Sequence, residues 1–321
     1  MDLNCCEEPH PPRASLDDAY EIDMDTATTI LAMLLETEAK YPRPNNYLFK
    51  AQTHGMDSSW RRRICDWMLD TGKAFELSLD TIACAVHLMD QYLCVLSVDK
   101  IVLQLLAMVC MYMASKVHEH RPISMEEMEL LCRNKYPRCE MIKMERRVLE
   151  IVSWKLNPPT AFAFARDLIG LEESAQIRPL LEASVNQLLS DCLSEYCFVE
   201  ALESVKAIAA LQVVCLTQFQ RASPLVKYAL DALDFPTDFY NECVRLMVVI
   251  AQKKYSVPLP THVPLYVRTS ADVSPQSTKR HPTRSTTPTG VDTPPHLLND
   301  RSSSSSTYGH IHKRARRGDC Q

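Results

Sequence analysis

Glycine is scarce in this chain, with only six in 321 residues. Loops that cradle a phosphate use glycine where the backbone must approach the ligand closely. The sequence also contains no P-loop, no H-E-x-x-H motif and no G-x-S-x-G motif. These absences argue against an all-α enzyme built on any of those motifs.

Strong net charge and long apolar runs are also missing. The net charge of −5 argues against a nucleic-acid-binding surface covering the whole protein. The longest apolar run, 101–114, is broken by Gln104 and is too short to span a bilayer. The first residues lack the basic-then-apolar order of a signal peptide. We therefore expect neither a membrane nor direct nucleic acid among the partners.

Cysteine, in contrast, is abundant, with 13 residues in the chain. The number is odd, and several cysteines stand singly inside apolar stretches, namely Cys65, Cys84, Cys110, Cys215 and Cys243. This pattern is typical of buried free thiols in a reducing compartment rather than of a disulfide framework. A zinc site would need four ligands at short paired spacings. The spacings do not fit for the Cys5–Cys6 pair, nor for His118 and His120 with Cys132 and Cys139. We predict no metal and no cofactor.

Composition divides the chain into four parts. Residues 1–25 carry eight acids against one base, which predicts a mobile acidic segment. Helical periodicity follows, and Pro158 and Pro159 interrupt it. Proline, serine and threonine dominate the end of the chain, which predicts a disordered tail. The predicted bounds of the three later parts are 26–156, 157–256 and 257–321.

Ten helices are predicted, five on each side of the proline break. Trp60, Ile64 and Trp67 recur at helical spacing behind Asp57, which predicts a capped amphipathic helix. Ser124 with Glu127 three residues later forms a capping box. Residues 100–116 are apolar nearly all round, as in a helix enclosed by others. The predicted fold class is all-α, with two tandem five-helix units.

Four blocks of this sequence resemble the N-terminal cyclin box in order and spacing. They read RRRICDWMLD, HLMDQYL, LQLLAMVCMYMASK and MIKMERRVLEIVSWKL, and the resemblance extends over about residues 26–255. The opening LNCCEE also resembles the L-x-C-x-E peptide near the start of D-type (G1) cyclins. The resemblance implies two stacked five-helix cyclin folds without catalytic activity. It implies a regulatory subunit that binds and activates a cyclin-dependent kinase in G1/S control.

The resemblance assigns Lys116 and Glu145 to the contact with the kinase. From the pattern alone, Lys116 is a cation at a helix C-terminus and Glu145 is one more solvated charge. The resemblance also implies a structural ion pair between Arg61 and Asp90.

A substrate-docking groove is the next feature that the resemblance implies, at Trp60, Arg63, Ile64, Trp67 and Gln104. Other cyclins carry an aliphatic side chain at the position of Arg63. The charge there predicts weak docking of peptides that combine apolar and basic residues. The family's other partners include inhibitors of the Cip/Kip type.

Residues Leu3, Cys5 and Glu7 carry the L-x-C-x-E pattern. An extended backbone places alternate residues on one side, so these three side chains face a partner together and Cys6 faces away. The resemblance names that partner as a retinoblastoma-type pocket protein.

Two further signals lie near the end of the chain. Thr287 precedes proline in a segment that resembles the site at which phosphorylation directs D-type cyclins to export and destruction. The basic cluster Lys313, Arg314, Arg316 and Arg317 reads either as a nuclear import signal or as solvated charge. We expect the protein in both nucleus and cytoplasm.

One alternative belongs to another functional class, that of a cyclin-fold transcription factor or transcription-associated cyclin. Such a protein would need a basic face on the folded region and usually a zinc ribbon. The sequence shows neither signal.

Overall fold

The computed structural model describes residues 24–172, 174–220, 223–232 and 237–255. The chain divides into two compact units, residues 1–269 and 270–321, and all described residues lie in the first. Because contacts join both predicted helical domains into that one unit, their division at residues 156 and 157 stays a prediction. Several predicted sites lie outside the described residues, namely Leu3, Cys5, Glu7, Thr287, Lys313, Arg314, Arg316 and Arg317.

The described residues form helices and no strand, which confirms the predicted all-α class. The elements are α1 (Met24–Lys40), α2 (Tyr47–Lys50), α3 (Ser58–Ala74), α4 (Leu79–Val95), α5 (Lys100–His118), α6 (Met125–Leu131), α7 (Arg138–Ile151), α8 (Ala161–Gly170), α9 (Ile177–Leu193), the 3₁₀ turn η1 (Tyr196–Phe198), α10 (Glu203–Thr217), α11 (Pro224–Ala232) and α12 (Thr237–Tyr255). The ten predicted helices correspond to α3 through α12. The prediction missed α1, α2 and η1.

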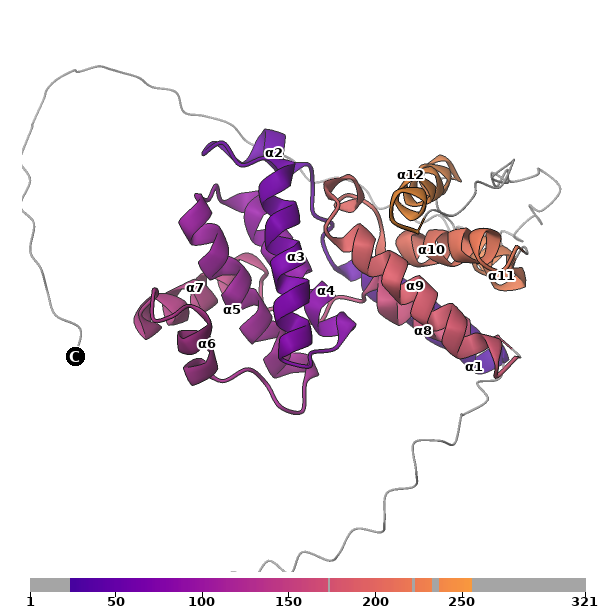
Figure 1. Cartoon of the computed structure of the whole chain (residues 1–321), viewed down its shortest axis with the longest axis horizontal. Coiled ribbons are helices and arrows are strands. Elements are labelled where there is room, and N and C mark those ends of the chain that lie inside the picture. Colours follow the sequence, from indigo (N-terminus) through magenta and orange to yellow (C-terminus); the bar gives the residue numbers. More distant parts are fainter. Residues whose placement is uncertain (1–23, 173, 221–222, 233–236, 256–321) are drawn as a thin grey trace, which may run out of the picture. The chain divides into compact units, whose positions relative to one another are not determined.

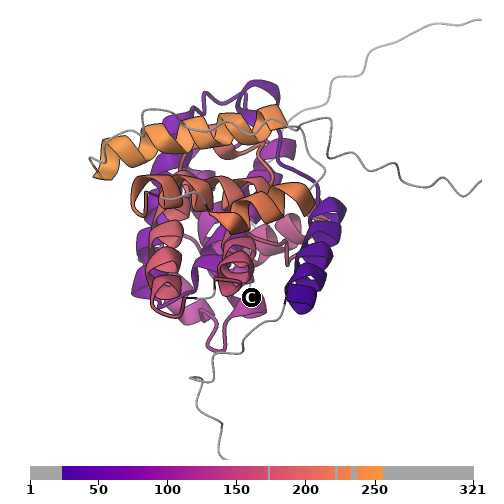
Figure 2. The same ribbon diagram turned by 90° about the vertical axis from the view of Figure 1, so that its right-hand side faces the viewer.

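Two hydrophobic clusters organise these helices. The first is built mainly from α3, α4, α5 and α7, and the second mainly from α8, α9, α10 and α12. Figure 1 shows the two groups of helices, and Figure 2 views the second group with α12 in orange and α1 in indigo. Helix α1 precedes the first group in sequence but packs against α8 of the second. Residues of α1 such as Leu31 therefore belong to the second cluster, although α1 precedes the first group of helices in the sequence.

Helix α5 lies at the centre of the first cluster and contacts α3, α4 and α7. Leu106, Met108 and Cys110 are fully buried, which confirms the prediction of an enclosed helix. Its length and composition alone would allow it to cross a membrane, but 61% of its most apolar window is buried inside the fold. That burial is typical of a core helix.

Local capping signals determine where several helices begin. The Asp57 carboxylate accepts hydrogen bonds from the backbone N–H groups of Ser59 and Trp60, at 2.8 and 3.2 Å. Ser124 and Glu127 form the predicted capping box at the start of α6. These caps satisfy backbone donors that have no partner within the helix. The starts of α3 and α6 were therefore predictable from sequence.

A long-range cap joins α1 to the start of α10. The buried Glu38 carboxylate accepts hydrogen bonds from the Ser204 backbone N–H at 3.0 Å and from the Ser204 hydroxyl at 2.7 Å. Burial raises the pKa of Glu38 above its ordinary value of 4.5, and the hydrogen bonds from Ser204 offset part of that rise. Helix α1 is thus held by this polar contact in addition to its apolar face, and the Lys155 ammonium donates to the Lys40 carbonyl at its end, at 2.7 Å.

The raised pKa of Glu38 predicts a pH-dependent loss of stability. Between pH 4.5 and the raised pKa the folded state binds more protons than the unfolded state, so stability falls as pH rises through that interval. Glu38→Gln keeps an acceptor for Ser204 and cannot ionise. The melting temperature of the variant relative to the parent should therefore be higher at pH 7 than at pH 4.5, measured by circular dichroism.

Glu36→Gln is the matched control, because Glu36 lies on the same helix with its side chain 72% exposed. Its melting temperature relative to the parent should differ little between the two pH values. Glu38→Ala should destabilise the protein at both, by about 1–3 kcal/mol, because the buried Ser204 N–H loses its acceptor. A relative melting temperature for Glu38→Gln that does not change with pH would contradict the assignment.

Candidate functional site

Lys116 and Glu145 meet on one surface of the first group of helices. Lys116 lies in the last turn of α5 and Glu145 in the middle of α7, and the Lys116 ammonium donates a hydrogen bond to the Glu145 carboxylate. The Lys116 nitrogen also lies 4.1 Å from the centre of the Tyr112 ring. The two side chains are 38% and 21% exposed. The structure brings the two predicted kinase contacts together, and their role stays a prediction.

Exposed apolar residues accompany this pair. Val117 follows Lys116 and is 44% exposed, and Ile142, one turn before Glu145 on α7, is 50% exposed. Trp154 follows the end of α7 and is 72% exposed, with a positive φ of 62°. The sequence interpretation missed these three residues. Val117 and Ile142 thus add exposed apolar surface close to the charged pair in sequence.

The Arg61–Asp90 pair is buried at the junction of the two groups of helices. Two parallel hydrogen bonds join the Arg61 guanidinium to the Asp90 carboxylate, at 2.9 and 2.8 Å. The Tyr47 hydroxyl donates to the same carboxylate at 2.8 Å. Arg61 also donates to the Leu193 carbonyl at 3.0 Å, where α9 ends. Burial and the adjacent Asp90 carboxylate raise the pKa of Tyr47 well above 10, so its hydroxyl remains a donor.

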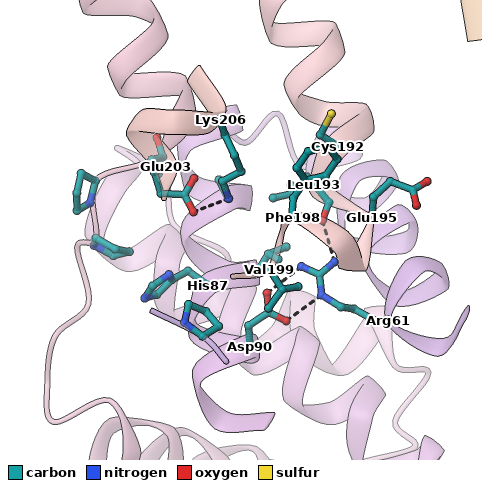
Figure 3. Close-up of a pocket in the computed structure, with 16 residues that line it drawn as sticks. Arg61, His87, Asp90, Cys192, Leu193, Glu195, Phe198, Val199, Glu203 and Lys206 are labelled. Atoms are coloured by element: carbon teal, nitrogen blue, oxygen red, sulfur yellow. Dashed lines mark hydrogen bonds and ion pairs between the residues drawn. The ribbon is translucent and has the colours of Figure 1, made fainter. Parts of the chain in front are cut away.

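A small polar cavity adjoins this pair, and Figure 3 shows the side chains that line it. The Arg61–Asp90 pair forms one wall, and the ion pair between Glu203 and Lys206 of α10, at 2.7 Å, forms another. Burial lowers the pKa of His87 between them, so its imidazole is neutral at pH 7. The Glu203 carboxylate also accepts from the Ala161 backbone N–H at the start of α8, at 3.1 Å. The cavity is therefore surrounded by groups with structural partners.

The predicted docking-groove residues lie on α3 and α5. A depression between these helices, which we call the docking groove, is lined by Trp60, Arg63, Ile64, Lys100, Leu103 and Gln104. Four of the five predicted residues line it. Trp67 does not, and instead packs half-buried against the first cluster. The sequence interpretation missed Lys100 and Leu103.

The other groups in the fold that could carry chemistry are the buried cysteine thiols and possible metal ligands. The five cysteines predicted to be buried are buried, which confirms that part of the prediction. Burial raises the pKa of Cys65 and Cys84 to about 12, so both thiols stay protonated. Among the described residues no group of three or more histidines, cysteines and acids is placed to hold a metal ion.

Comparison with known proteins assigns part of this chain to a known domain family. Residues 29–157 match the model of the cyclin N-terminal domain. These residues form a cyclin N-terminal domain. The chain is similar to Cyclin-A2-1 of Arabidopsis thaliana, with 28% identity over 65% of this chain and 49% of that protein. It is also similar to Cyclin-A2 of Xenopus laevis, with 30% identity over 64% of this chain and 49% of that protein.

The fold of this chain is also similar to that of a solved structure. A viral cyclin from herpesvirus saimiri superposes with a TM-score of 0.60 at 19% identity, over 70% of this chain and 97% of that chain. At that identity the similarity concerns the fold alone. The chain spans about half the length of the curated relatives named above.

The buried ion pair predicts an unequal cost for two substitutions. Asp90→Ala leaves the Arg61 guanidinium buried without a counter-charge and should lower the free energy of unfolding by about 3–5 kcal/mol. Tyr47→Phe removes one hydrogen bond to the same carboxylate and should cost about 1 kcal/mol. Urea unfolding followed by circular dichroism measures both. Equal costs would show that the charge of Arg61 is not held by Asp90.

Proposed function

We propose that this chain is a non-catalytic regulatory subunit that binds and activates a cyclin-dependent kinase. The observation that carries the proposal is the surface on which Lys116 and Glu145 meet beside exposed Val117 and Ile142. The match of residues 29–157 to the cyclin N-terminal domain supports it. The chain supplies a binding surface and contributes no atom to phosphoryl transfer.

A protein kinase is active only when the lysine of its strand β3 pairs with the glutamate of its helix αC. A rigid surface that binds helix αC in that position shifts the kinase toward the active state. Lys116 and Glu145 offer a donor and an acceptor for charge-assisted hydrogen bonds to such a helix. Val117 and Ile142 offer apolar contact next to them.

The ion pair between Lys116 and Glu145 can open so that each side chain binds the kinase instead. Their side chains are 38% and 21% exposed, and ion pairs near the surface contribute only about 0–1 kcal/mol. Opening the pair therefore costs little. Each side chain can then bind the kinase, while the buried cores of α5 and α7 keep both backbones in place.

The double variant Lys116→Ala/Glu145→Ala tests this surface. It should lower activation of a kinase by at least tenfold at limiting cyclin, equivalent to about 1.4 kcal/mol of binding free energy. Phosphorylation of a peptide by a recombinant cyclin-dependent kinase that the parent activates is the measurement. Circular dichroism should show an unchanged helix content.

The matched control is Arg245→Ala/Glu242→Ala, which removes an exposed ion pair on α12 at 3.2 Å. This control should activate the kinase like the parent. If the Lys116/Glu145 variant also activates normally while remaining folded, the proposed surface is wrong.

The finer proposal is that the chain acts as a D-type-like cyclin in G1/S control and targets the kinase to retinoblastoma-type pocket proteins. Its support is the peptide Leu3, Cys5 and Glu7 within an acidic segment. The relatives named above are A-type cyclins, so this peptide alone carries the finer proposal. We also propose, from sequence signals, that Thr287 controls lifetime and that the cluster at 313–317 directs nuclear import.

Two substitutions in the opening peptide test the pocket-protein proposal. Cys5→Ala and Glu7→Lys should each weaken binding to a retinoblastoma-type pocket domain by tenfold or more, about 1.4 kcal/mol, in isothermal titration calorimetry. Cys6→Ala is the control and should have little effect, because alternate residues of an extended peptide face opposite sides. Binding should persist with chelator and reductant present. Equal sensitivity to the two cysteine substitutions would overturn the assignment.

A further inference from the structure

The docking groove combines an apolar floor with a basic rim. Trp60 and Ile64 of α3 face Leu103 of α5, and all three belong to or pack on the first hydrophobic cluster. Arg63 and Lys100 line the same depression, and both are exposed. No acidic residue lines the groove among the described residues.

A third cation extends the basic rim. The Lys135 ammonium donates to the side-chain oxygen of Gln104 at 3.2 Å, and Gln104 lines the groove. The Tyr136 hydroxyl lies 3.2 Å from the same oxygen, and the Lys135 nitrogen lies 5.0 Å from the centre of the Tyr136 ring. The neighbouring segment before α7 therefore places a positive charge beside α5.

The three cations are held by neutral groups. The Lys100 nitrogen lies 4.5 Å from the centre of the Trp60 ring, and Arg63 contacts the Ser59 hydroxyl at 3.5 Å. In the described part of the chain neither Arg63, Lys100 nor Lys135 forms an ion pair with an acid. Their charges are therefore available to a ligand.

Two acids near these cations in sequence are already used as helix caps, and Asp66, three residues after Arg63, accepts a hydrogen bond from the Ser194 hydroxyl at 2.5 Å. The Asp57 carboxylate accepts from backbone N–H groups at the start of α3. The Asp99 carboxylate accepts from the Ile101 and Val102 N–H groups at the start of α5, at 2.9 and 2.8 Å. These bonds engage one oxygen of each carboxylate. The hydrogen bond from Ser59 and, to a smaller extent, the charge of Arg63 lower the pKa of Asp57, but Asp57 forms no ion pair with Arg63. The rim keeps an excess of positive charge.

We propose that the docking groove binds a segment of a partner protein that is both apolar and acidic. An apolar side chain of that segment packs on Trp60 and Leu103, and aspartate or glutamate side chains beside it pair with Arg63, Lys100 and Lys135. Charge complementarity selects this partner, and like charges exclude segments that carry lysine or arginine at the same places. The inference deepens the proposed function by naming the partner class, but the binding it describes needs no kinase.

Three synthetic peptides with one apolar core and different flanking residues test the inference. The core is Leu-Ser-Phe in each, and the flanks are all glutamate, all glutamine or all lysine. Fluorescence anisotropy with the full-length chain should give the affinity order glutamate, glutamine, lysine. The first and last should differ by about tenfold or more at 50 mM salt, equivalent to about 1.4 kcal/mol. The ratio should shrink at 500 mM salt, because salt screens exposed charges.

Variants of the rim assign the effect to this groove. Lys100→Glu and Lys135→Glu should each weaken the glutamate-flanked peptide and strengthen the lysine-flanked one. Arg63→Ile, which adds an aliphatic surface and removes a charge, should change the two affinities in the same directions. Lys73→Glu is the control, because Lys73 is exposed on α3 but does not line the groove, and it should leave the ratio nearly unchanged.

Three results would overturn the proposal. They are absence of binding by any peptide, equal or tighter binding of the lysine-flanked peptide, and equal effects of the rim variants and Lys73→Glu. All variants must retain the helix content of the parent. Because no kinase is present, a failure here leaves the surface at Lys116 and Glu145 untouched, and a failure there leaves this result standing.

Discussion

The buried ion pair between Arg61 and Asp90 is the interaction on which the arrangement of the helices depends. A guanidinium 3% exposed is tolerable only because Asp90 neutralises it and because its remaining N–H group reaches the Leu193 carbonyl. The carbonyl is at the end of α9, where a cation also opposes the negative end of the helix dipole. One side chain thus fixes α3 against α4 and against the second group of helices.

Close packing around α4 also restricts the positions of the helices that carry Lys116 and Glu145. Gly72 of α3 lies so near α4 that a β-carbon there would stand 2.4 Å from the end of the Ile82 side chain. Helix α4 in turn packs more extensively against α5 than against any other helix, and the residues of α5 that face the core are fully buried. Because α5 cannot shift without opening this core, Lys116 is held at a defined place relative to α7 and Glu145.

The sequence predicted the features whose signals are local, and missed those that depend on distant residues. Asp57, and Ser124 with Glu127, act within three residues, and they mark the starts of α3 and α6. Helix α1 buries Leu31 and Glu38 and packs Leu34 and Leu35 in part against the second cluster, and its polar partner Ser204 is 166 residues away. Nothing local marks such a contact. The placement of Lys116 and Glu145 on one surface was expected from resemblance to the cyclin box, and the ion pair between them was not predicted.

The cations of the docking groove also depend on contacts between distant residues. Burial, in turn, separates two kinds of ion pair in this fold. Lys100 and Lys135 read as ordinary surface charges in the sequence, and only the packing of α3, α5 and the segment before α7 places them beside Trp60 and Gln104. The Arg61–Asp90 pair is buried and holds the fold, so losing one partner leaves a buried charge. The Lys116–Glu145 pair is half-exposed, so water or another protein can replace either partner at small cost. The exposed pair lies on α5 and α7, which pack in the same cluster as α3 and α4, the helices that the buried pair joins.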